Sequence, residues 1–307
     1  MRLAAIDIGT NSTKMTVADV SANGTLVVVS EQSEVTRLGE GVDASRRLTK
    51  AAMSRTLDAV LAFAAAARYE GAEYVLAAGT SALRDAANGA DFIAMVKSRA
   101  QVIVEIIAGD REAQLAYAAV RSDSSLPLPQ SANLLVFDIG GGSTELILGD
   151  ATGVGRHKSL DIGAVRLTER FLHSDPPTEY EVEQATHYAR AAFGTFPLPD
   201  TAPLIAGIGG TAINLAAVTH KLDLPDPDAV HGVSLSIADV TAALDHFKRV
   251  DLAERRLIPG LEPKRADVII AGAIILDCLL TYFSADQFLI SARGLRYGLL
   301  AEYFKSL

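Results

Sequence analysis

Two short turns of nearly the same sequence constrain this chain more than any other feature. The first is Asp7-Ile-Gly-Thr-Asn-Ser-Thr13, and the second, 131 residues later, is Asp138-Ile-Gly-Gly-Gly-Ser-Thr144; they agree at five of seven positions. Each turn lies between two apolar segments of strand length, residues 3–8 and 14–20 for the first, 133–137 and 145–148 for the second. A repeat of this period is too long for a solenoid unit. It therefore predicts two related domains that face each other.

The residue types in these turns suit an anionic ligand. Glycine and small hydroxyl residues at a tight turn leave several backbone N–H groups open to phosphate oxygens. A carboxylate beside phosphate is better placed to hold a divalent cation, so we predict Asp7 and Asp138 as metal-side carboxylates. The predicted phosphate-side donors are Thr10, Asn11, Ser12, Gly141, Gly142 and Ser143. One such turn alone fits an ordinary β-hairpin, but two matched copies favour a shared anionic ligand and its cation.

The rest of the chain alternates strands with amphipathic helices, which indicates an α/β fold. The clearest helices are predicted at residues 49–69, 90–100, 110–120, 178–193, 211–219, 236–249 and 266–282. A Ser- and Pro-rich segment, residues 122–131, is the best linker. We therefore place a first lobe at residues 1–125 and a second at 126–307. The last helix, about 294–307, either belongs to the second lobe or packs back on the first.

A third glycine cluster lies between a predicted strand and a predicted helix. Gly207, Gly209 and Ala212 match the G-x-G-x-x-A dinucleotide fingerprint. One such element late in the chain does not make a Rossmann half, which argues against a nicotinamide cofactor. Two interpretations stay open: Gly209, Gly210 and Thr211 bind an anion or nucleotide, or the turn only packs closely.

Composition excludes several classes of protein. The 307 residues carry a net charge of −9, which argues against nucleic-acid binding. Every apolar run is interrupted before 18 residues, so we expect no membrane span and a cytoplasmic protein. The single cysteine, Cys278, lies in an apolar segment and is expected to be buried. Signatures of P-loop, serine-hydrolase, zincin and zinc-ribbon proteins are all missing from the sequence.

Seven motifs, in order along nearly the whole chain, resemble the exopolyphosphatase and guanosine pentaphosphate phosphohydrolase family of the actin-like superfamily. They are Asp7-Ile-Gly-Thr-Asn-Ser12, Thr36-Arg-Leu-Gly-Glu-Gly41, Gly79-Thr-Ser-Ala-Leu-Arg-Asp-Ala86, Ile106-Ile-Ala-Gly-Asp-Arg-Glu-Ala113, Val136-Phe-Asp-Ile-Gly-Gly-Gly-Ser-Thr-Glu145, Ile258-Pro-Gly-Leu261 and Ser291-Ala-Arg-Gly-Leu-Arg296. Two departures are notable. Arg111 stands where many members have Glu, and Gly79 replaces the more usual Ala.

The resemblance implies two actin-like (ribonuclease H-like) lobes with an interdomain cleft, in a short form without appended helical domains. It also implies hydrolysis of a terminal phosphate with Mg²⁺ or another divalent cation. We expect Glu112, in the first turn of a helix capped by Asp110, to be the general base. Glu145 is expected to be a metal ligand or to orient one, against the alternative of a solvated strand residue.

Arginines are the expected partners of substrate phosphate, because the guanidinium fork matches phosphate oxygens. Arg84 is the leading candidate, and the weaker ones are Arg37, Arg166, Arg265 and Arg293. Residues 1–131 carry a net charge of −2 and residues 132–307 a net charge of −7. A polyanionic substrate would therefore need a local basic lining, for which Lys264-Arg265, Arg255-Arg256 and Arg156-His157-Lys158 are available.

The leading functional hypothesis is an exopolyphosphatase that removes terminal phosphates from inorganic polyphosphate. The alternative within the same chemistry is a phosphohydrolase of guanosine pentaphosphate, with guanosine penta- or tetraphosphate as a further partner. An actin-like small-molecule kinase and a non-catalytic sensor of polyphosphate or the alarmone are more remote. A homodimer is expected by base rate and by the resemblance.

Overall fold

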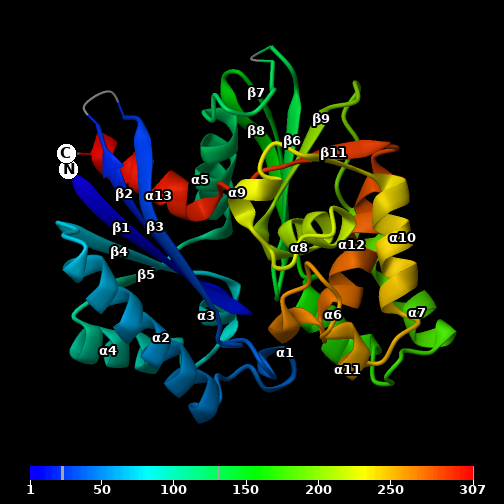
Figure 1. Ribbon diagram of the computed structural model, residues 1–307, viewed down its shortest axis with the longest axis horizontal. Coiled ribbons are helices and arrows are strands. Elements are labelled where there is room, and N and C mark those ends of the chain that lie inside the picture. Colours follow the sequence, from blue (N-terminus) through cyan, green and yellow to red (C-terminus); the bar gives the residue numbers. More distant parts are fainter. Residues whose placement is uncertain (22–23, 130, 307) are drawn as a thin grey trace. The chain divides into compact units, whose positions relative to one another are not determined.

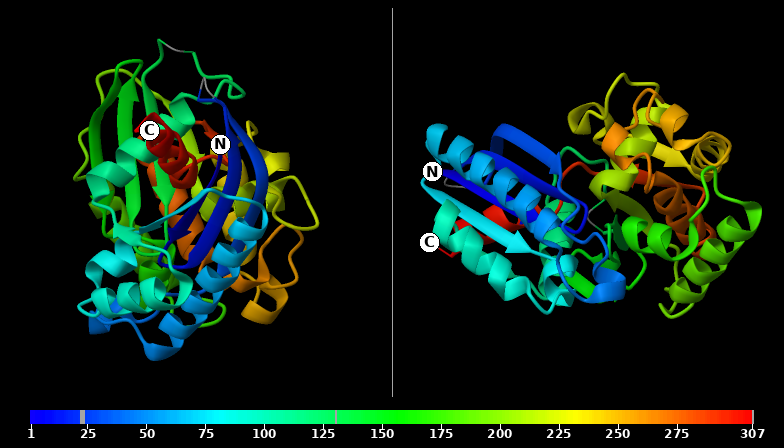
Figure 2. Two further views of the ribbon diagram at one scale, coloured as in Figure 1. Left: turned by 90° about the vertical axis from the view of Figure 1, so that its left-hand side faces the viewer. Right: turned by 90° about the horizontal axis from the view of Figure 1, so that it is seen from below.

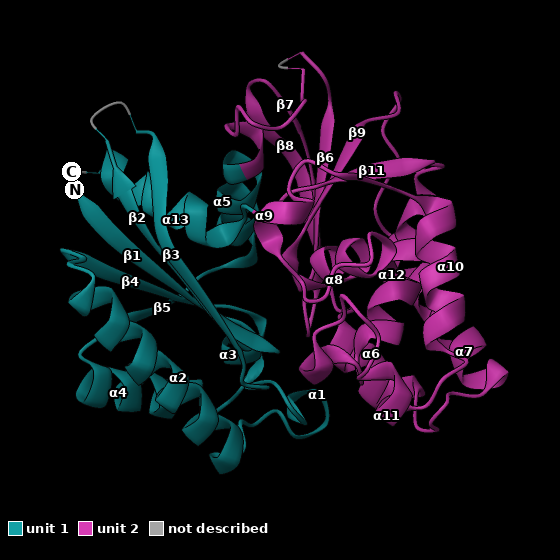
Figure 3. Cartoon of the chain, in the orientation of Figure 1, with its two compact units in different colours: residues 1–119, 293–307 teal, residues 120–292 magenta. Residues whose placement is uncertain are grey.

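The chain forms two compact units, each described here by itself. The structure is a computed structural model that describes residues 1–21, 24–129 and 131–306. Unit 1 comprises Met1–Ala119 and Arg293–Leu307, and unit 2 comprises Val120–Ala292 (Figure 3). The structure divides the chain after Ala119, whereas the sequence predicted the boundary after residue 125. The last helix lies with unit 1, which is one of the two assignments that the sequence left open.

Unit 1 contains one sheet and the helices that cover it (Figure 1). Its elements are β1 (Arg2–Ile8), β2 (Ser12–Val20), β3 (Leu26–Val35), α1 (Val42–Ser45), α2 (Lys50–Tyr69), β4 (Tyr74–Gly79), α3 (Ser81–Asp85), α4 (Gly89–Ala100), β5 (Val104–Ile106), α5 (Gly109–Arg121) and α13 (Leu295–Lys305). The strand order is β3-β2-β1-β4-β5. The first three strands are antiparallel, whereas β4 and β5 run parallel to β1.

Strand β1 is buried on both faces, which explains its almost continuous apolar sequence. Ala4, Ile6 and Ile8 pack with side chains of α2 and α4. Leu3 and Ala5, which alternate with them, pack with Leu295, Leu299 and Leu300 of α13. The two views of Figure 2 show α2 and α4 on one side of the sheet and the red C-terminal helix on the other. The period of two along β1 therefore places its carboxyl end, with Asp7, between two helical layers.

Unit 2 repeats this plan. Its elements are β6 (Leu134–Ile139), β7 (Thr144–Asp150), β8 (Gly153–Leu160), α6 (Ala164–Phe171), α7 (Glu179–Phe193), β9 (Leu204–Ile208), α8 (Gly209–Thr219), α9 (Pro227–Val230), β10 (Ser234–Ser236), α10 (Ile237–Phe247), α11 (Leu252–Arg255), the 3-10 helix η1 (Pro263–Arg265), α12 (Ile269–Tyr282) and β11 (Gln287–Ile290). The sheet order β8-β7-β6-β9-β11 matches that of unit 1 strand for strand, and β10 extends it antiparallel to β11. The α/β fold with two related units is confirmed.

The core of unit 2 centres on α12, whose sequence is apolar around its whole circumference. The helix is buried from Ile269 almost to its end and packs with α6, α7, α8 and α10. Cys278 is 1% exposed there, as expected, and burial raises the pKa of its thiol to about 11. Among the described residues, no helix combines the length and hydropathy that a bilayer crossing requires.

Two local expectations differ from the structure. The segment 122–131 is not an open linker: Asp123 and Leu126 are buried, and the Asp123 carboxylate lies 3.2 Å from His231 Nε2. Gln130, within that segment, lies outside the described residues. The short helices α3 and α6 were not predicted. Both lie beside the candidate site described next.

Candidate active site

The turn after β1 is closed by its own backbone. Gly9 N–H donates to Ser12 O at 3.1 Å, so β1 returns directly into β2. Side chains of Thr10, Asn11 and Ser12 are all more than nine-tenths buried. A Cβ on Gly9 would meet Ser12 O at 2.9 Å, so glycine is required for this tight return. The turn is therefore a rigid feature at the carboxyl end of β1, next to Asp7.

The segment after β3 fixes this turn from outside. Thr36 N–H and Arg37 N–H both donate to Asn11 O, at 3.0 and 2.9 Å, and Gly39 N–H donates to Thr10 O at 2.9 Å. A Cβ on Gly39 would meet the Thr10 side chain. This explains why the sequence Thr36-Arg-Leu-Gly-Glu-Gly41 accompanies the turn. Its backbone N–H groups bind the carbonyls of Thr10 and Asn11 and so fix the position of the turn.

Asn11 is the buried polar side chain of this turn that the protein leaves without a hydrogen bond. The residue is 6% exposed, and neither Oδ1 nor Nδ2 bonds to any group among the described residues. Buried amides are normally satisfied, because an unmade hydrogen bond costs about 1–3 kcal/mol. An Nδ2–H donor in this position fits an anionic ligand.

The matching turn in unit 2 closes in the same way, with Gly140 N–H donating to Ser143 O at 2.9 Å. Its other carbonyls are bound by the start of α6. Val165 N–H donates to Gly141 O at 2.9 Å, and Arg166 Nε donates to Gly142 O at 2.8 Å. Arg166 is 6% exposed. The structure thus uses this arginine to hold the turn, and a contact between Arg166 and phosphate stays a prediction.

Asp138 and Glu145 face each other across the β6–β7 pairing. Glu145 is 5% exposed, and its Oε1 accepts hydrogen bonds from Ser143 Oγ at 2.6 Å and Ser159 Oγ at 2.9 Å. It is not the solvated strand residue that was the alternative. Among the residues that the structure describes, no three His, Cys, Asp or Glu side chains gather closely enough to bind a metal by themselves. One or two carboxylates per unit suit Mg²⁺, which keeps several waters and also binds phosphate oxygens.

The third glycine cluster brings further predicted residues to Asp138. Gly209 has φ +87°, and a Cβ there would meet the Asp138 carboxylate. A Cβ on Gly210 would meet the guanidinium of Arg265. Thr211 Oγ donates to Ile139 O at 3.2 Å. The positive φ at Gly209 favours glycine there, a side chain at Gly210 would displace the Arg265 guanidinium, and the two residues place the start of α8 beside a carboxylate and an arginine.

Arg265 is the cation beside Asp138 in unit 2, and its side chain is only partly exposed. Burial lowers the pKa of its guanidinium, and the charges of Glu262, Asp138 and Asp267 oppose that shift. An arginine remains protonated at any physiological pH, so Arg265 supplies a positive charge next to Asp138. The other predicted basic groups are largely engaged: Arg255 is 3% exposed and donates to three backbone carbonyls, while Arg156 and Lys158 donate to the carbonyls of Pro197 and Thr195.

In unit 1, Glu112 is paired with Arg84. Arg84 Nη1 donates to Glu112 Oε2 at 2.5 Å and to Ile107 O at 3.0 Å. Both side chains are largely buried, with 22% of Arg84 and 14% of Glu112 exposed. Asp110 does not cap the helix as expected: α5 begins at Gly109, which places both Asp110 and Glu112 inside its first turn. The short helix α3 carries Arg84 to this position.

Sequence reasoning missed three of these features. Gly163 is one, because a Cβ there would meet the backbone of Gly141 and Gly142. The role of Arg166 is another, although its position two residues into a helix after that glycine was a usable signal. Arg293, predicted as a weak phosphate contact, lies over the Tyr297 ring at 5.7 Å within unit 1. The third missed feature is the pairing of Arg84 with Glu112, which had no local signal in the sequence.

Comparison with known proteins agrees with this architecture. The model of the Ppx/GppA phosphatase family matches residues 16–307. A protein named exopolyphosphatase 2 from Mycobacterium tuberculosis is 37% identical over 90% of this chain and 89% of its own length. The crystal structure of an exopolyphosphatase-like protein has a TM-score of 0.91 at 31% identity and covers 98% of this chain and 97% of that one.

A second solved structure, the Aquifex aeolicus member of the Ppx/GppA family, has a TM-score of 0.82 at 34% identity. It covers all of this chain, which in turn covers 98% of that structure. The family match begins at residue 16, after the first turn, and extends over the rest of unit 1 and all of unit 2, whereas the Aquifex aeolicus structure covers the whole chain, including both turns. The chain belongs to the Ppx/GppA phosphatase family.

Proposed function

We propose that the protein is an exopolyphosphatase that hydrolyses the terminal phosphoanhydride bond of inorganic polyphosphate. The observation that carries the proposal is the same closed turn in each unit, each following a strand whose penultimate residue is an aspartate. In unit 1 the turn offers the buried Asn11 amide, and in unit 2 the neighbouring α8 start and Arg265 add a positive potential. Relatives named exopolyphosphatase support the same substrate.

Glu112 is the proposed general base. It accepts a proton from a water molecule whose oxygen attacks the terminal phosphorus. The new P–O bond forms as the bridging P–O bond breaks, and the shortened chain leaves with that electron pair. The products are orthophosphate and a chain one phosphate shorter. Arg84 fixes the Glu112 carboxylate, because it is itself anchored to the carbonyl of Ile107.

The proposed metal-side residues are Asp7 in unit 1 with Asp138 and Glu145 in unit 2. A divalent cation such as Mg²⁺ would neutralise charge on phosphate oxygens and make phosphorus easier to attack. Thr10, Asn11, Ser12, Gly141, Gly142, Ser143, Gly209, Gly210, Thr211 and Arg265 are the proposed phosphate-side groups. We propose that both turns act on one substrate molecule. Homodimer assembly and a cytoplasmic location stay predictions from the sequence.

Replacing Glu112 with Gln tests the proposed base. General-base catalysis typically contributes about 10²–10⁴ in rate, so phosphate release from polyphosphate with Mg²⁺ should fall by about that factor. Glu183→Gln, an exposed position on α7, is the matched control and should keep wild-type turnover. If Glu112→Gln keeps near wild-type turnover, the assigned base is wrong. Assaying guanosine pentaphosphate in parallel decides between the two substrates.

A further inference from the structure

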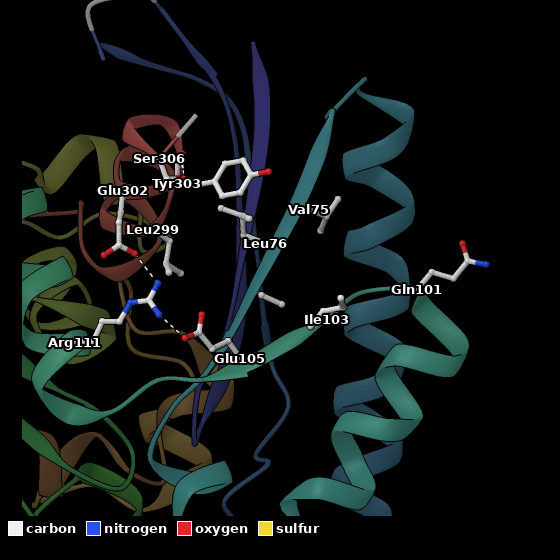
Figure 4. A pocket seen from close by; sticks show the side chains of 11 residues that line it. Val75, Leu76, Gln101, Ile103, Glu105, Arg111, Leu299, Glu302, Tyr303 and Ser306 are labelled. Carbon is white, nitrogen blue, oxygen red and sulfur yellow. Dashed lines mark hydrogen bonds and ion pairs between the residues drawn. The ribbon is translucent and has the colours of Figure 1, made fainter.

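Unit 1 contains a cavity that the proposed reaction does not use. It lies between α13, the start of α5 and the strands β4 and β5, and its volume is about 600 Å³ (Figure 4). That volume is in the range of sites that bind small organic molecules. Neither the Thr10–Ser12 turn nor the Arg84–Glu112 pair contributes a lining residue. We call it the Arg111 pocket.

The floor of the Arg111 pocket is apolar. Its apolar side chains are Leu76 of β4, Leu299 of α13 and that of Ile103, a residue that is 74% exposed; Val75 and Ala77 of β4 also border it, but their side chains pack with the core on the α2 and α4 side of the sheet. The Tyr303 ring points toward β4 in Figure 4. Such a floor can cover the hydrocarbon part of a ligand, and the face of a tyrosine ring attracts cations.

The rim of the pocket is charged and has a net charge of −1. Arg111 Nη1 donates a hydrogen bond to Glu105 Oε1, and Arg111 Nη2 donates one to Glu302 Oε2 at 2.6 Å. These contacts raise the pKa of Arg111, with Glu302 as the main cause. The arginine is thus neutralised by one carboxylate, and the second carboxylate remains as excess charge. About half of each Glu side chain is exposed, so both are accessible to a ligand.

This charge balance selects the class of ligand. A phosphate or carboxylate that approached Arg111 would meet two glutamates already bound to it. A cation would instead add to the Glu–Arg–Glu arrangement and restore neutrality. We propose that the Arg111 pocket binds an organic monocation, an amine whose ammonium group contacts Glu105 and Glu302 while its apolar body covers Leu76, Ile103 and Leu299. The site is therefore distinct in chemistry from the proposed polyphosphate site.

Three probes of nearly the same shape test the proposal on the full chain without polyphosphate. They are 2-phenylethylamine, 2-phenylethanol and phenylacetate, which carry charges of +1, 0 and −1 near neutral pH. Calorimetry or ligand-observed NMR should show the amine binding about tenfold more tightly than the alcohol, and the carboxylate most weakly. Added salt should lower the affinity for the amine and leave the affinity for the alcohol unchanged, because only binding of the amine depends on charge. Equal affinities for amine and alcohol, or no binding of the amine, would overturn the proposal.

Charge substitutions on the pocket rim give a sharper test. Glu302→Gln removes the excess charge, so amine affinity should fall about tenfold to the level of the alcohol. Glu105→Gln with Glu302→Gln leaves Arg111 as net +1, so the carboxylate should become the preferred probe. Asp58→Asn, an exposed position on α2, is the control and should leave all affinities unchanged. The proposal is wrong if the double variant still binds the amine more tightly than the carboxylate. It is also wrong if the control substitution lowers the affinity for the amine as much as Glu302→Gln does. The salt dependence of wild-type protein decides the question if the variants fail to fold.

Discussion

Arg84 and Glu112 constrain each other more than their separate sequence positions suggest. The guanidinium is fixed by a backbone carbonyl and a carboxylate on one nitrogen, Nη1. It therefore holds Glu112 in one orientation, which a general base needs. We infer that Arg84 is a positioning residue for the proposed base, in contrast to the direct phosphate contact expected from the sequence.

Arg84→Lys tests this role. An ammonium group cannot reproduce the guanidinium geometry, and a charge-assisted hydrogen bond is worth about 1.5–3 kcal/mol. We expect kcat for phosphate release to fall about 10–100-fold with little change in KM. Arg99→Lys, an exposed position on α4, is the matched control. A raised KM with unchanged kcat would instead support direct contact between Arg84 and phosphate.

Among the elements, two helices of unit 2 begin with reciprocal capping. Thr178 Oγ accepts from Glu181 N–H at the start of α7, and the Glu181 carboxylate accepts from Thr178 N–H at 2.7 Å. Ser236 and Asp239 repeat this arrangement at the start of α10. The S/T-x-x-D/E pattern therefore sets both helix starts, which lie within one residue of the predicted ones.

The α7 cap predicts a pH dependence of stability. Hydrogen bonds from Thr178 N–H, and secondarily from the Thr178 hydroxyl and the N–H groups of His173 and Ser174, lower the pKa of Glu181 to about 2. Because the folded pKa lies below the ordinary value of 4.5, the contribution is complete above pH 4.5 and is lost as pH falls toward 2. We expect urea midpoints of wild type to drop more between pH 5 and pH 3 than those of Glu181→Gln. Equal drops would contradict this assignment.

Element prediction failed where length or burial obscured the pattern. Helix α3 has five residues, too few to show a helical period. Strand β3 is continuous from Leu26 to Val35, although its residues 30–34 are mostly polar, because they pair with β2 at the edge of the sheet. A bulge opposite Val17 and Ala18 further disturbs its alternation. The buried strands β1 and β6 have no such ambiguity.

At the scale of the whole molecule, the repeat in the sequence becomes a repeat in topology. The turns at Asp7 and Asp138 follow equivalent central strands, and this could be predicted because Gly, Ser and Thr at a turn have local consequences. Contacts across long sequence separation could not. Arg111 binds Glu302, 191 residues away, and nothing near either residue indicates the partner. The two turns could thus be predicted from the sequence, whereas the Arg84–Glu112 pair and the Arg111 pocket could be recognised only from the tertiary structure.

We propose that both turns, one in each unit, act on a single polyphosphate substrate. Asp7→Asn and Asp138→Asn test it directly, with Asp91→Asn and Asp200→Asn as exposed controls in the same units. Charge stabilisation by a bound cation is worth several kcal/mol, so each of the two variants should lose at least about 100-fold in kcat/KM with Mg²⁺. The controls should retain wild-type rates. Loss of activity in one variant alone, with the other near wild type, would show that only one turn participates.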